Sequence, residues 1–516
     1  MSYFGAVAGI SLVASMMVAI VGGVKGAVGS FVAIASLLLA FKYPWQSLYA
    51  FIIYLPFSGT ITYVIGAGSN PLMQLAKDAF YIPALIGVIQ YCKRRKIEWF
   101  VPKALKPPVM MLLGYCGLVL LFINGGQQLA PTGSEKPFLM GILGLKVFMG
   151  YIPLIPCTYY LLRTKDEFFR MMRLMTVLIL ICCGLGLVQY MFLKTGRCQG
   201  TVGEGAELFK ASLESRCLVG GSLLFNEEQG VIRLPGTFVA PWQWGWFLIS
   251  SAFFTFATAF SDRTWYWRLV GLFGMLMTMV MAVLSGQRIA LALVPICYGI
   301  LLITTGQLVN LTRFLPILIL LGLFIVGALA SYPEVVQERV DSFASRWEAS
   351  PPTEFIADQF SFVQDLSGLL GKGLGRATNS ARAMGDVKLI ETYFPKVMFE
   401  IGPLGLLLFL GLVTTLTIIT FKAFRRVKDK NLRGMGAALW TYVLLISYNT
   451  YYYPLDVDPV AVYYWFAAGM ILKLPELDRE VDETAVLDPP KKKRRRGPLA
   501  PKFGGTEPQD STEENR

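Results

Sequence analysis

The sequence predicts an all-α membrane protein, a polytopic helix bundle with about 12–14 spans and two long extracytoplasmic loops. Hydrophobic residues make up 54% of the 516 residues and charged residues only 16%, and the mean hydropathy is +0.54. This balance is too apolar for a soluble chain of that length. Runs without a charge recur, as at 109–123, 269–284 and 315–330, and such runs indicate spanning helices, whereas barrel strands would alternate apolar and polar residues.

The apolar runs, taken in order, predict about fourteen helices, give or take two. They lie at residues 6–22, 26–41, 46–65, 77–91, 108–123, 139–162, 171–193, 240–260, 265–284, 289–305, 312–330, 397–421, 435–452 and 459–473. The N-terminal run lacks a basic region and a clear small-residue cleavage site. We therefore interpret it as retained helices rather than as a removed signal peptide.

The Lys and Arg residues between the helices predict the orientation of the chain. Six lie in 92–106, four in 163–173 and six in 422–433, and all three segments fall on one face if the N-terminus is cytoplasmic. Because an excess of Lys and Arg marks cytoplasmic loops, we predict that the N- and C-termini are both cytoplasmic.

The same alternation places segments 194–239 and 331–395 on the outer side. The first holds five basic and five acidic residues and the second six basic and nine acidic residues, so neither has the cytoplasmic excess of positive charge. Loops this long in a compact protein are usually functional or disordered. The predicted organisation is a transmembrane domain at 1–475 with these two outer loops, followed by a disordered basic cytoplasmic tail at 476–516.

Composition excludes several classes of chemistry and of partner. Histidine is absent, which rules out Ser-His-Asp triads, HExxH zinc sites and imidazole acid–base schemes. The net charge of +13 includes a run of six basic residues at 491–496. In a polytopic protein this run favours contact with anionic lipid over a nuclear signal, and we expect no nucleic-acid partner.

Two of the eight cysteines, Cys198 and Cys217, share the outer loop 194–239. An oxidising compartment allows such residues to pair, so we predict a disulfide between them. The other six lie in predicted helices or at a cytoplasmic edge, where a cysteine is usually a small hydrophobic residue.

Charge is costly inside a bilayer, so each charge within a predicted helix is a candidate functional residue. These charges are Lys77, Asp78, Lys146, Arg288, Lys396 and Glu400. The predicted topology places all of them in the outer half of the membrane or at its outer surface, although snorkelling would also explain Lys77 and Lys396. The distribution favours a polar cavity open to the outer leaflet, and hence an enzyme over a carrier with polar groups at the midplane.

Three outer segments carry motifs in a fixed order. They are Arg233-Leu-Pro-Gly-Thr-Phe-Val-Ala-Pro241, then Ser285-Gly-Gln-Arg288, and then a segment with Arg346-Trp347, Gly371-Lys-Gly-Leu-Gly-Arg376, Glu391 and the helix start Phe399-Glu400-Ile-Gly402. This set resembles the O-antigen ligase and O-antigen polymerase superfamily of bacterial envelope enzymes over about residues 140–425. The joint order and spacing carry the resemblance, because each motif alone is weak.

The resemblance implies a glycosyltransferase, either polymerase or ligase, on the outer face of the bacterial plasma membrane. Such an enzyme moves a glycan from an undecaprenyl-pyrophosphate carrier to an acceptor hydroxyl in cell-surface polysaccharide biosynthesis. The expected partners are the polyprenyl-pyrophosphate-linked glycan, an acceptor glycan or lipid, and the bilayer; no cofactor and no metal is expected. The alternatives are a carrier or flippase for lipid-linked oligosaccharide and, less favoured, a non-catalytic membrane scaffold.

The chemistry of the transfer assigns roles to the motif residues. Arg233 and Arg288 offer forked donors to a pyrophosphate leaving group without a metal. The resembled family commonly has its functional His eleven residues before Gly402, where this chain has Glu391, so Glu391 is the candidate base for the acceptor hydroxyl. Candidate substrate-binding residues are Lys146, as a third member of the clamp, with Arg346 and Arg376.

The triplet Asp456-Val-Asp458 is similar to the DxD motif that holds a metal and a nucleotide sugar in many soluble glycosyltransferases. Asp458 precedes Pro459 at the start of a predicted helix, which favours a helix N-cap followed by a proline at the first helical position. The adjacent residues 451–453 are all Tyr, and an interfacial aromatic belt explains them better than stacking on a sugar.

Overall fold

The computed structural model describes residues 3–65, 76–130, 133–201, 211, 215–226, 231–307 and 351–487, together with a few single residues between 308 and 350. The chain divides into two units, Met1–Asp478 and Arg479–Arg516, and the account below concerns the first. The predicted helix at 312–330, Arg346 and the basic run at 491–496 lie outside the described residues.

Helices dominate the N-terminal third of the chain. The elements are α1 (Tyr3–Lys42), α2 (Pro44–Tyr54), η1 (Leu55–Phe57), η2 (Thr60–Ile65), α3 (Ala76–Arg95), α4 (Lys106–Leu118), η4 (Val119–Asn124) and α5 (Gly125–Leu129). Gly23 has φ 63° inside α1 and breaks its helical conformation, which agrees with the two helices predicted at 6–22 and 26–41. The stretch from α4 through α5 is continuous over the helix predicted at 108–123.

The middle of the chain contains several long helices and a small hairpin. The elements are α6 (Pro137–Met149), α7 (Leu154–Leu161), α8 (Lys165–Lys194), β1 (Leu224–Asn226), β2 (Val231–Arg233), α9 (Pro241–Ser261), α10 (Trp265–Leu284) and α11 (Arg288–Thr304). The single helix predicted at 139–162 is wrong, because α6 and α7 are separate helices bent by 41°. Pro153 at the junction has no N–H to continue the helical hydrogen bonds.

The C-terminal part begins with a helix that was not predicted. The elements are α14 (Pro352–Ser367), η7 (Asn379–Met384), α15 (Tyr393–Arg425), α16 (Lys430–Tyr448), η8 (Pro454–Asp456) and α17 (Val460–Leu487). The amphipathic helix α14 lies within the segment 331–395, which the sequence analysis treated as an irregular loop. It packs against α15 and is central to both sites described below.

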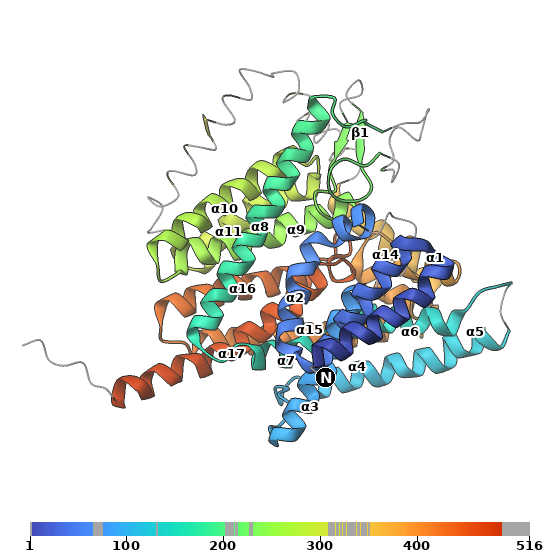
Figure 1. Cartoon of the computed structure of the whole chain (residues 1–516), viewed down its shortest axis with the longest axis horizontal. Coiled ribbons are helices and arrows are strands. Elements are labelled where there is room, and N and C mark those ends of the chain that lie inside the picture. Colours follow the sequence, from blue (N-terminus) through green and yellow to red (C-terminus); the bar gives the residue numbers. More distant parts are fainter. Residues whose placement is uncertain are drawn as a thin grey trace, which may run out of the picture. The chain divides into compact units, whose positions relative to one another are not determined.

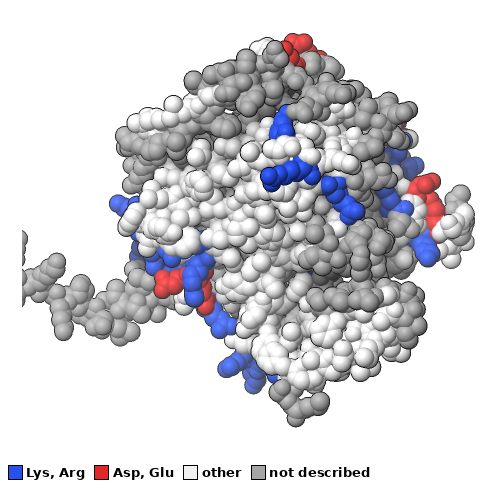
Figure 2. All heavy atoms as spheres, turned by 45° about the horizontal axis from the view of Figure 1, so that its top comes forward, with Lys and Arg blue, Asp and Glu red and all other residues white. Residues whose placement is uncertain are grey.

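Several of these helices can cross a membrane. Among the described residues, five helices are long and apolar enough, or six if the bent pair of α6 and α7 counts as one span. The five are Lys106–Leu129, Lys165–Lys194, Pro241–Ser261, Trp265–Leu284 and Tyr393–Arg425. On the face that Figure 2 shows, uncharged side chains cover most of the described surface, and charged side chains gather in a few patches. An almost entirely helical protein, with several helices long and apolar enough to span a membrane, is therefore confirmed.

Helix α9 lies at the centre of the group that it forms with α8, α10, α11 and α16 (Figure 1). An apolar stretch of 18 residues within it, long enough to cross a membrane, is entirely buried inside the protein. Thr258 of α9 accepts or donates a 2.9 Å hydrogen bond with Thr176 of α8, and Ser250 bonds with Tyr442 of α16 at 3.2 Å. Polar side chains thus join helices that would otherwise associate through packing alone.

Ion pairs bring the basic segments to one end of the bundle. Lys165 at the start of α8 lies 3.4 Å from Asp429, in the connection between α15 and α16, and Arg173 lies 2.8 Å from Asp262, in the connection between α9 and α10. The ring of Phe100 stacks on Tyr159 with 3.7 Å between centroids, which adds the segment 92–106. The three segments predicted to share a face therefore lie together.

Asp429 caps α16 and should make stability depend on pH. Burial raises its pKa, but hydrogen bonds from the N–H groups of Leu432 and Asn431 and the charge of Lys165 outweigh this, and the pKa lies below its usual value. Because the pKa is lower in the folded state, the charged carboxylate stabilises the fold at pH values above the unfolded-state pKa, near 3.9. This contribution is lost as the pH falls through the folded-state pKa. We expect the unfolding temperature of the wild type to fall below about pH 4.

The measurement is thermal unfolding in lipid nanodiscs from pH 6 to pH 3, comparing wild type with Asp429→Asn. Because Asn keeps the cap but loses the negative charge, the substituted protein should be less stable at pH 6 by about 0.3–1 kcal/mol, and it should converge with the wild type at low pH. Asp365→Asn, at an exposed carboxylate of α14, is the matched control. Parallel pH profiles for wild type and Asp429→Asn would contradict the assignment.

A disulfide joins Cys198 and Cys217, with Cα atoms 5.5 Å apart and a sequence separation of 19 residues. These are the two cysteines that the sequence analysis pairs. The bond follows α8, whose 30 residues span about 45 Å, so it lies at the end of the bundle opposite Lys165. The end of α8 lies beside β1 (Figure 1), where Lys194 lies 5.7 Å from the ring centroid of Phe225.

Mass spectrometry of the native protein under non-reducing conditions should recover Cys198 and Cys217 in one cross-linked peptide pair. Replacing both by Ser should lower the free energy of unfolding by roughly 3 kcal/mol, because the bond closes a loop of this size. Alkylation of both thiols in the native protein without a reductant would refute the bond.

Close backbone contacts fix the glycine-rich segment that follows α14. An added Cβ at Gly144 of α6 would lie 2.3 Å from the backbone nitrogen of Gly375, and one at Gly402 would lie 2.0 Å from the carbonyl oxygen of Leu369. Asn124 at the end of η4 also accepts a hydrogen bond from the N–H of Leu374 at 2.9 Å. The segment is therefore held between η4, α6 and α15.

Candidate functional site

The β-hairpin positions Arg233 beside the start of α11. The N–H of Leu234 donates to the carbonyl oxygen of Ser285 at 2.9 Å. Gly286 has φ 68°, and an added Cβ there would lie 1.8 Å from the carbonyl oxygen of Ile232, so only glycine allows this approach. Arg233, exposed at the end of β2, and Arg288, half-buried as the first residue of α11, therefore come from adjacent segments.

Glu391 is held by its backbone next to the connection between α16 and α17. Its N–H donates to the side-chain oxygen of Gln359 in α14 at 3.1 Å. The following residue, Thr392, forms isolated β-bridges with Tyr451 and Tyr452, and the N–H of Tyr393 donates to the carbonyl oxygen of Thr450 at 2.8 Å. Segments more than fifty residues apart thus fix the position of Glu391.

Tyr451 links Arg288 to Glu391. Burial raises the pKa of its phenol most, the neighbouring Tyr452 and the charge of Glu391 raise it further, and the charge of Arg288 lowers it. The side chains of Arg288 and Glu391 therefore both lie within electrostatic range of this phenol. The ring of Tyr451 also meets Phe355 of α14 edge-on, with 6.0 Å between centroids. We call Arg233, Arg288, Glu391 and Tyr451 the arginine–glutamate site.

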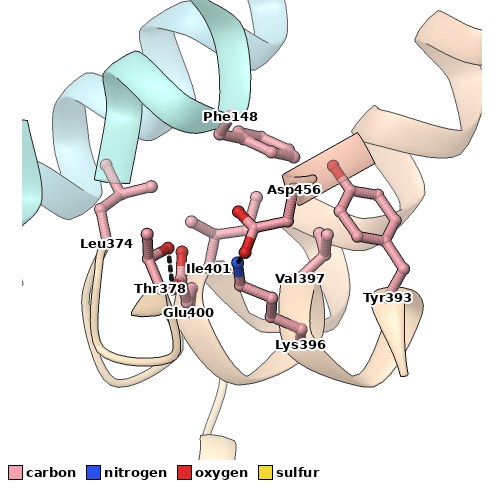
Figure 3. A pocket seen from close by; sticks show the side chains of 9 residues that line it. All are labelled: Phe148, Leu374, Thr378, Tyr393, Lys396, Val397, Glu400, Ile401 and Asp456. Atoms are coloured by element: carbon pink, nitrogen blue, oxygen red, sulfur yellow. Dashed lines mark hydrogen bonds and ion pairs between the residues drawn. The ribbon is translucent and has the colours of Figure 1, made fainter. Parts of the chain in front are cut away.

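A second group of charges lies inside the protein between α3, α6, α15 and the connection before α17. Lys146 pairs with Asp78 at 2.8 Å, Lys396 pairs with Asp456 at 2.5 Å, and Lys77 pairs with Asp458. Figure 3 shows Lys396 pointing at Asp456 across the small pocket that both residues line. We call these six residues the buried ion-pair cluster.

Glu400 adjoins the buried ion-pair cluster and shares its pocket with Lys396 and Asp456 (Figure 3). Its carboxylate accepts hydrogen bonds from the N–H of Ala377 at 2.8 Å and from the hydroxyl of Thr378 at 2.9 Å. These bonds connect the start of α15 to the glycine-rich segment. Glu400 therefore has a structural role.

The buried ion-pair cluster changes two interpretations made from the sequence. Lys146 was placed in the phosphate clamp, but its ion pair is with Asp78 of α3. Asp458 was interpreted as an N-cap, but α17 begins at Val460 and the carboxylate pairs with Lys77. A signal was present in the sequence, because buried lysines need carboxylate partners and the charges singled out within or beside the predicted spans include three lysines but only two acids.

Arg376 lies in a third location. Its guanidinium donates to Glu135 at 3.0 Å and to the side-chain oxygen of Gln127 at 2.9 Å. A hydrogen bond from the N–H of Asp386 and the charge of Arg376 bring the pKa of Glu135 below its usual value, although burial raises it. Arg376 also lines a pocket of about 470 Å³.

The segments that carry Arg233 and Arg288 thus lie side by side, and the charges of Arg288 and Glu391 both act on Tyr451, which the sequence predicts as part of an aromatic belt. Two forked cations near a carboxylate and a phenol can bind an anionic group and accept a proton from a bound hydroxyl. Within the described residues, no group of three or more His, Cys, Asp and Glu side chains is suited to a metal ion.

Comparisons with known proteins give no relative from which a function could be transferred. No protein-family model matches the chain, and no curated protein matches it.

Proposed function

We propose that the protein is a metal-independent membrane glycosyltransferase, a polymerase or ligase of cell-surface polysaccharide. It would transfer a glycan from a polyprenyl-pyrophosphate carrier to an acceptor hydroxyl at the outer face of the bacterial plasma membrane. The observation that supports this best is the arginine–glutamate site, in which Arg233, Arg288 and Glu391 come from three segments of the chain. The resemblance of their motifs to the O-antigen ligase and polymerase superfamily supplies the substrate class.

The proposed topology has about 12–14 spans, cytoplasmic termini, and the loops 194–239 and 331–395 outside. Two observations support it. The basic segments gather at the Lys165 end of α8, and a positive excess marks the cytoplasmic side. The disulfide follows the other end of the same helix, and disulfides form in oxidising, non-cytoplasmic compartments.

The reaction has one bond formed and one broken. The acceptor oxygen bonds to the anomeric carbon of the donor sugar, and the bond from that carbon to the pyrophosphate oxygen breaks. The hydroxyl proton passes to Glu391, and the pyrophosphate leaves on its lipid. Arg233 and Arg288 stabilise the charge that develops on the leaving phosphate, where forked donors are most effective.

Gene deletion followed by sizing of surface polysaccharide and lipid-linked intermediates tests the proposal. Single repeat units retained on the carrier would identify a polymerase, and full-length chains retained on the carrier would identify a ligase. Intermediates trapped on the cytoplasmic face would instead identify the carrier or flippase alternative, and unchanged glycans would refute a role in this pathway.

The variants Arg233→Lys and Arg288→Lys should each lose most of the transfer activity while the protein is still made and inserted. Lysine keeps the charge but loses the planar fork that contacts two phosphate oxygens. Transfer is measured with purified lipid-linked donor, and Arg382→Lys, at an exposed arginine of η7, is the matched control. Normal turnover in both variants would remove the arginines from the leaving-group role.

A further inference from the structure

The pocket beside Arg376 has a charge balance suited to an anion. It has a volume of about 470 Å³ and is lined by Lys372, Arg376, Lys388 and Asp386, together with apolar residues that include Leu366 and Phe399. Three cations therefore face one carboxylate. Because the guanidinium of Arg376 already donates hydrogen bonds to Glu135 and Gln127, the side chain of Arg376 forms a rigid part of the pocket lining.

The two lysines are available to a ligand. Both are exposed, and neither forms an ion pair with another of the described residues. The ammonium of Lys388 lies 5.0 Å from the ring centroid of Phe362, which directs it along α14. A pyrophosphate that links a lipid to a glycan carries one negative charge on each of its two phosphates, so it matches two lysines better than a single phosphodiester with one charge.

Exposed apolar side chains surround this cationic pocket. The pocket residue Leu366 is 37% exposed, and Phe362, Leu369, Leu370 and Leu389 are 40%, 72%, 38% and 51% exposed. Large apolar side chains that are exposed together mark a lipid or protein contact.

The location of the pocket agrees with contact with lipid. Gln127 lies near the end of the candidate span Lys106–Leu129, and Phe399 lies near the start of the candidate span Tyr393–Arg425. The pocket is therefore at the level where two spanning helices end, which is where the phosphate of a membrane lipid resides. A soluble anion would gain nothing from the apolar surroundings.

We propose that this pocket binds the phosphate of a lipid-anchored second substrate, with Lys372 and Lys388 contacting the phosphate and the exposed leucines contacting its hydrocarbon chain. The ligand class is a glycan-bearing pyrophosphate on a long isoprenoid chain. Its role as the acceptor rests on the proposed function, because a transfer between two lipid-linked glycans needs two phosphate sites.

Helix α14 runs from the arginine–glutamate site to the pocket, so its length indicates the distance between the two sites. Phe355 contacts Tyr451 of the arginine–glutamate site, and Leu366, eleven residues later, lines the pocket. That separation along a helix is about 16 Å, long enough for a few sugar units to extend from one bound phosphate to the reacting hydroxyl. Gln359 between them holds the backbone of Glu391, so the same helix supports both sites.

Native mass spectrometry of the full-length protein tests the proposal, with decaprenyl monophosphate as the probe. All titrations use an Arg233→Ala/Arg288→Ala background, which removes lipid binding at the proposed donor site. Decaprenyl monophosphate should bind this background protein. Adding Lys372→Ala and Lys388→Ala should weaken binding roughly thirty-fold, because each lysine near a lipid phosphate changes affinity about fivefold.

Arg382→Ala, which removes an exposed cation of η7 outside the pocket lining, is the matched control and should bind as the background does. An unchanged affinity in the double lysine variant would overturn the proposal. Displacement of the lipid by an equal concentration of inorganic phosphate would show a site for soluble anions instead, and equal binding of phosphatidylglycerol would show a general contact with anionic lipid. Either result overturns the substrate site.

The binding test is independent of the test of the proposed function. If gene deletion leaves surface glycans unchanged while decaprenyl monophosphate still binds through Lys372 and Lys388, the transferase proposal fails and the lipid-phosphate site stands. If deletion blocks polymer formation but the lysine variants bind normally, the function stands and the pocket assignment fails.

Discussion

Glu391→Gln is expected to reduce turnover by roughly 10²–10⁴, the usual contribution of a general base, with little change in donor binding. The amide occupies nearly the same volume as the carboxylate but cannot accept the proton of the acceptor hydroxyl. Because the backbone N–H of Glu391 bonds with Gln359 and the next residue pairs with Tyr451, the main chain should keep its position. The measurement is single-turnover transfer with saturating lipid-linked donor.

Asp358→Asn is the control for this substitution, because it makes the same chemical change at an exposed carboxylate of α14 next to Gln359. It should transfer at the wild-type rate. Glu391→His should retain part of the activity, since imidazole is also a competent base. Wild-type turnover by Glu391→Gln while Arg288→Lys is inactive would leave leaving-group stabilisation as the only chemical role of the site.

Lys396→Met is expected to cause the largest loss of stability, about 3–5 kcal/mol, because it leaves a buried carboxylate without its partner. Lys396 lies 2.5 Å from Asp456, and the two side chains are only 5% and 9% exposed. Thermal unfolding in nanodiscs measures the effect. Lys422→Met makes the same substitution at an exposed position of the same helix and should change stability by less than about 0.5 kcal/mol.

The double variant Lys396→Met/Asp456→Asn separates pairing from packing. Removing both charges eliminates the unpaired carboxylate, so the double variant should be clearly more stable than Lys396→Met alone. If the double variant is as unstable as the sum of the two single variants, the two charges do not interact, and the contribution of Lys396 is packing by its aliphatic stem.

The positions of the helices could be predicted because a long apolar run can satisfy its backbone hydrogen bonds in a bilayer only by forming a helix. Helix α8 (Lys165–Lys194) covers the run predicted at 171–193, and α10 (Trp265–Leu284) matches the predicted bounds. Bends inside a run were not predicted, since hydropathy does not change at them. The Gly-Tyr-Ile-Pro sequence ending at Pro153 is the local feature that would have separated α6 from α7.

Helix α14 and the β-hairpin were missed for a different reason. In the segment Pro352–Ser367, three acidic residues interrupt the seven apolar ones, so it carries no spanning signal. Its buried residues, Val363 and Ser367, face α15, a partner that lies beyond the reach of a local pattern. The hairpin has strands of three residues each, and strands this short depend on tertiary contacts such as that between Leu234 and Ser285.

The candidate site could be predicted in its residue types but not in its grouping. The resemblance, supported by the chemistry of a pyrophosphate and a hydroxyl, predicts Arg233, Arg288 and Glu391, and a backbone hydrogen bond places the segments of Arg233 and Arg288 side by side. Lys146 has the same chemistry, but the nearest opposite charge, Asp78, determines its position. Sequence spacing cannot rank competing ion pairs between helices, because their energies depend on three-dimensional distance and burial.

The complete burial of α9 has a consequence for how the chain enters the membrane during synthesis. Of the five candidate spans, α9 has the lowest mean hydropathy, and it carries Ser250, Ser251, Thr255 and Thr258, all buried. The translocon inserts each segment according to that segment's own affinity for lipid, so α9 alone should be inserted inefficiently. Insertion of α9 should therefore wait for α10, and a nascent chain truncated between them should leave the Pro241–Ser261 segment accessible to a water-soluble thiol reagent at an introduced cysteine.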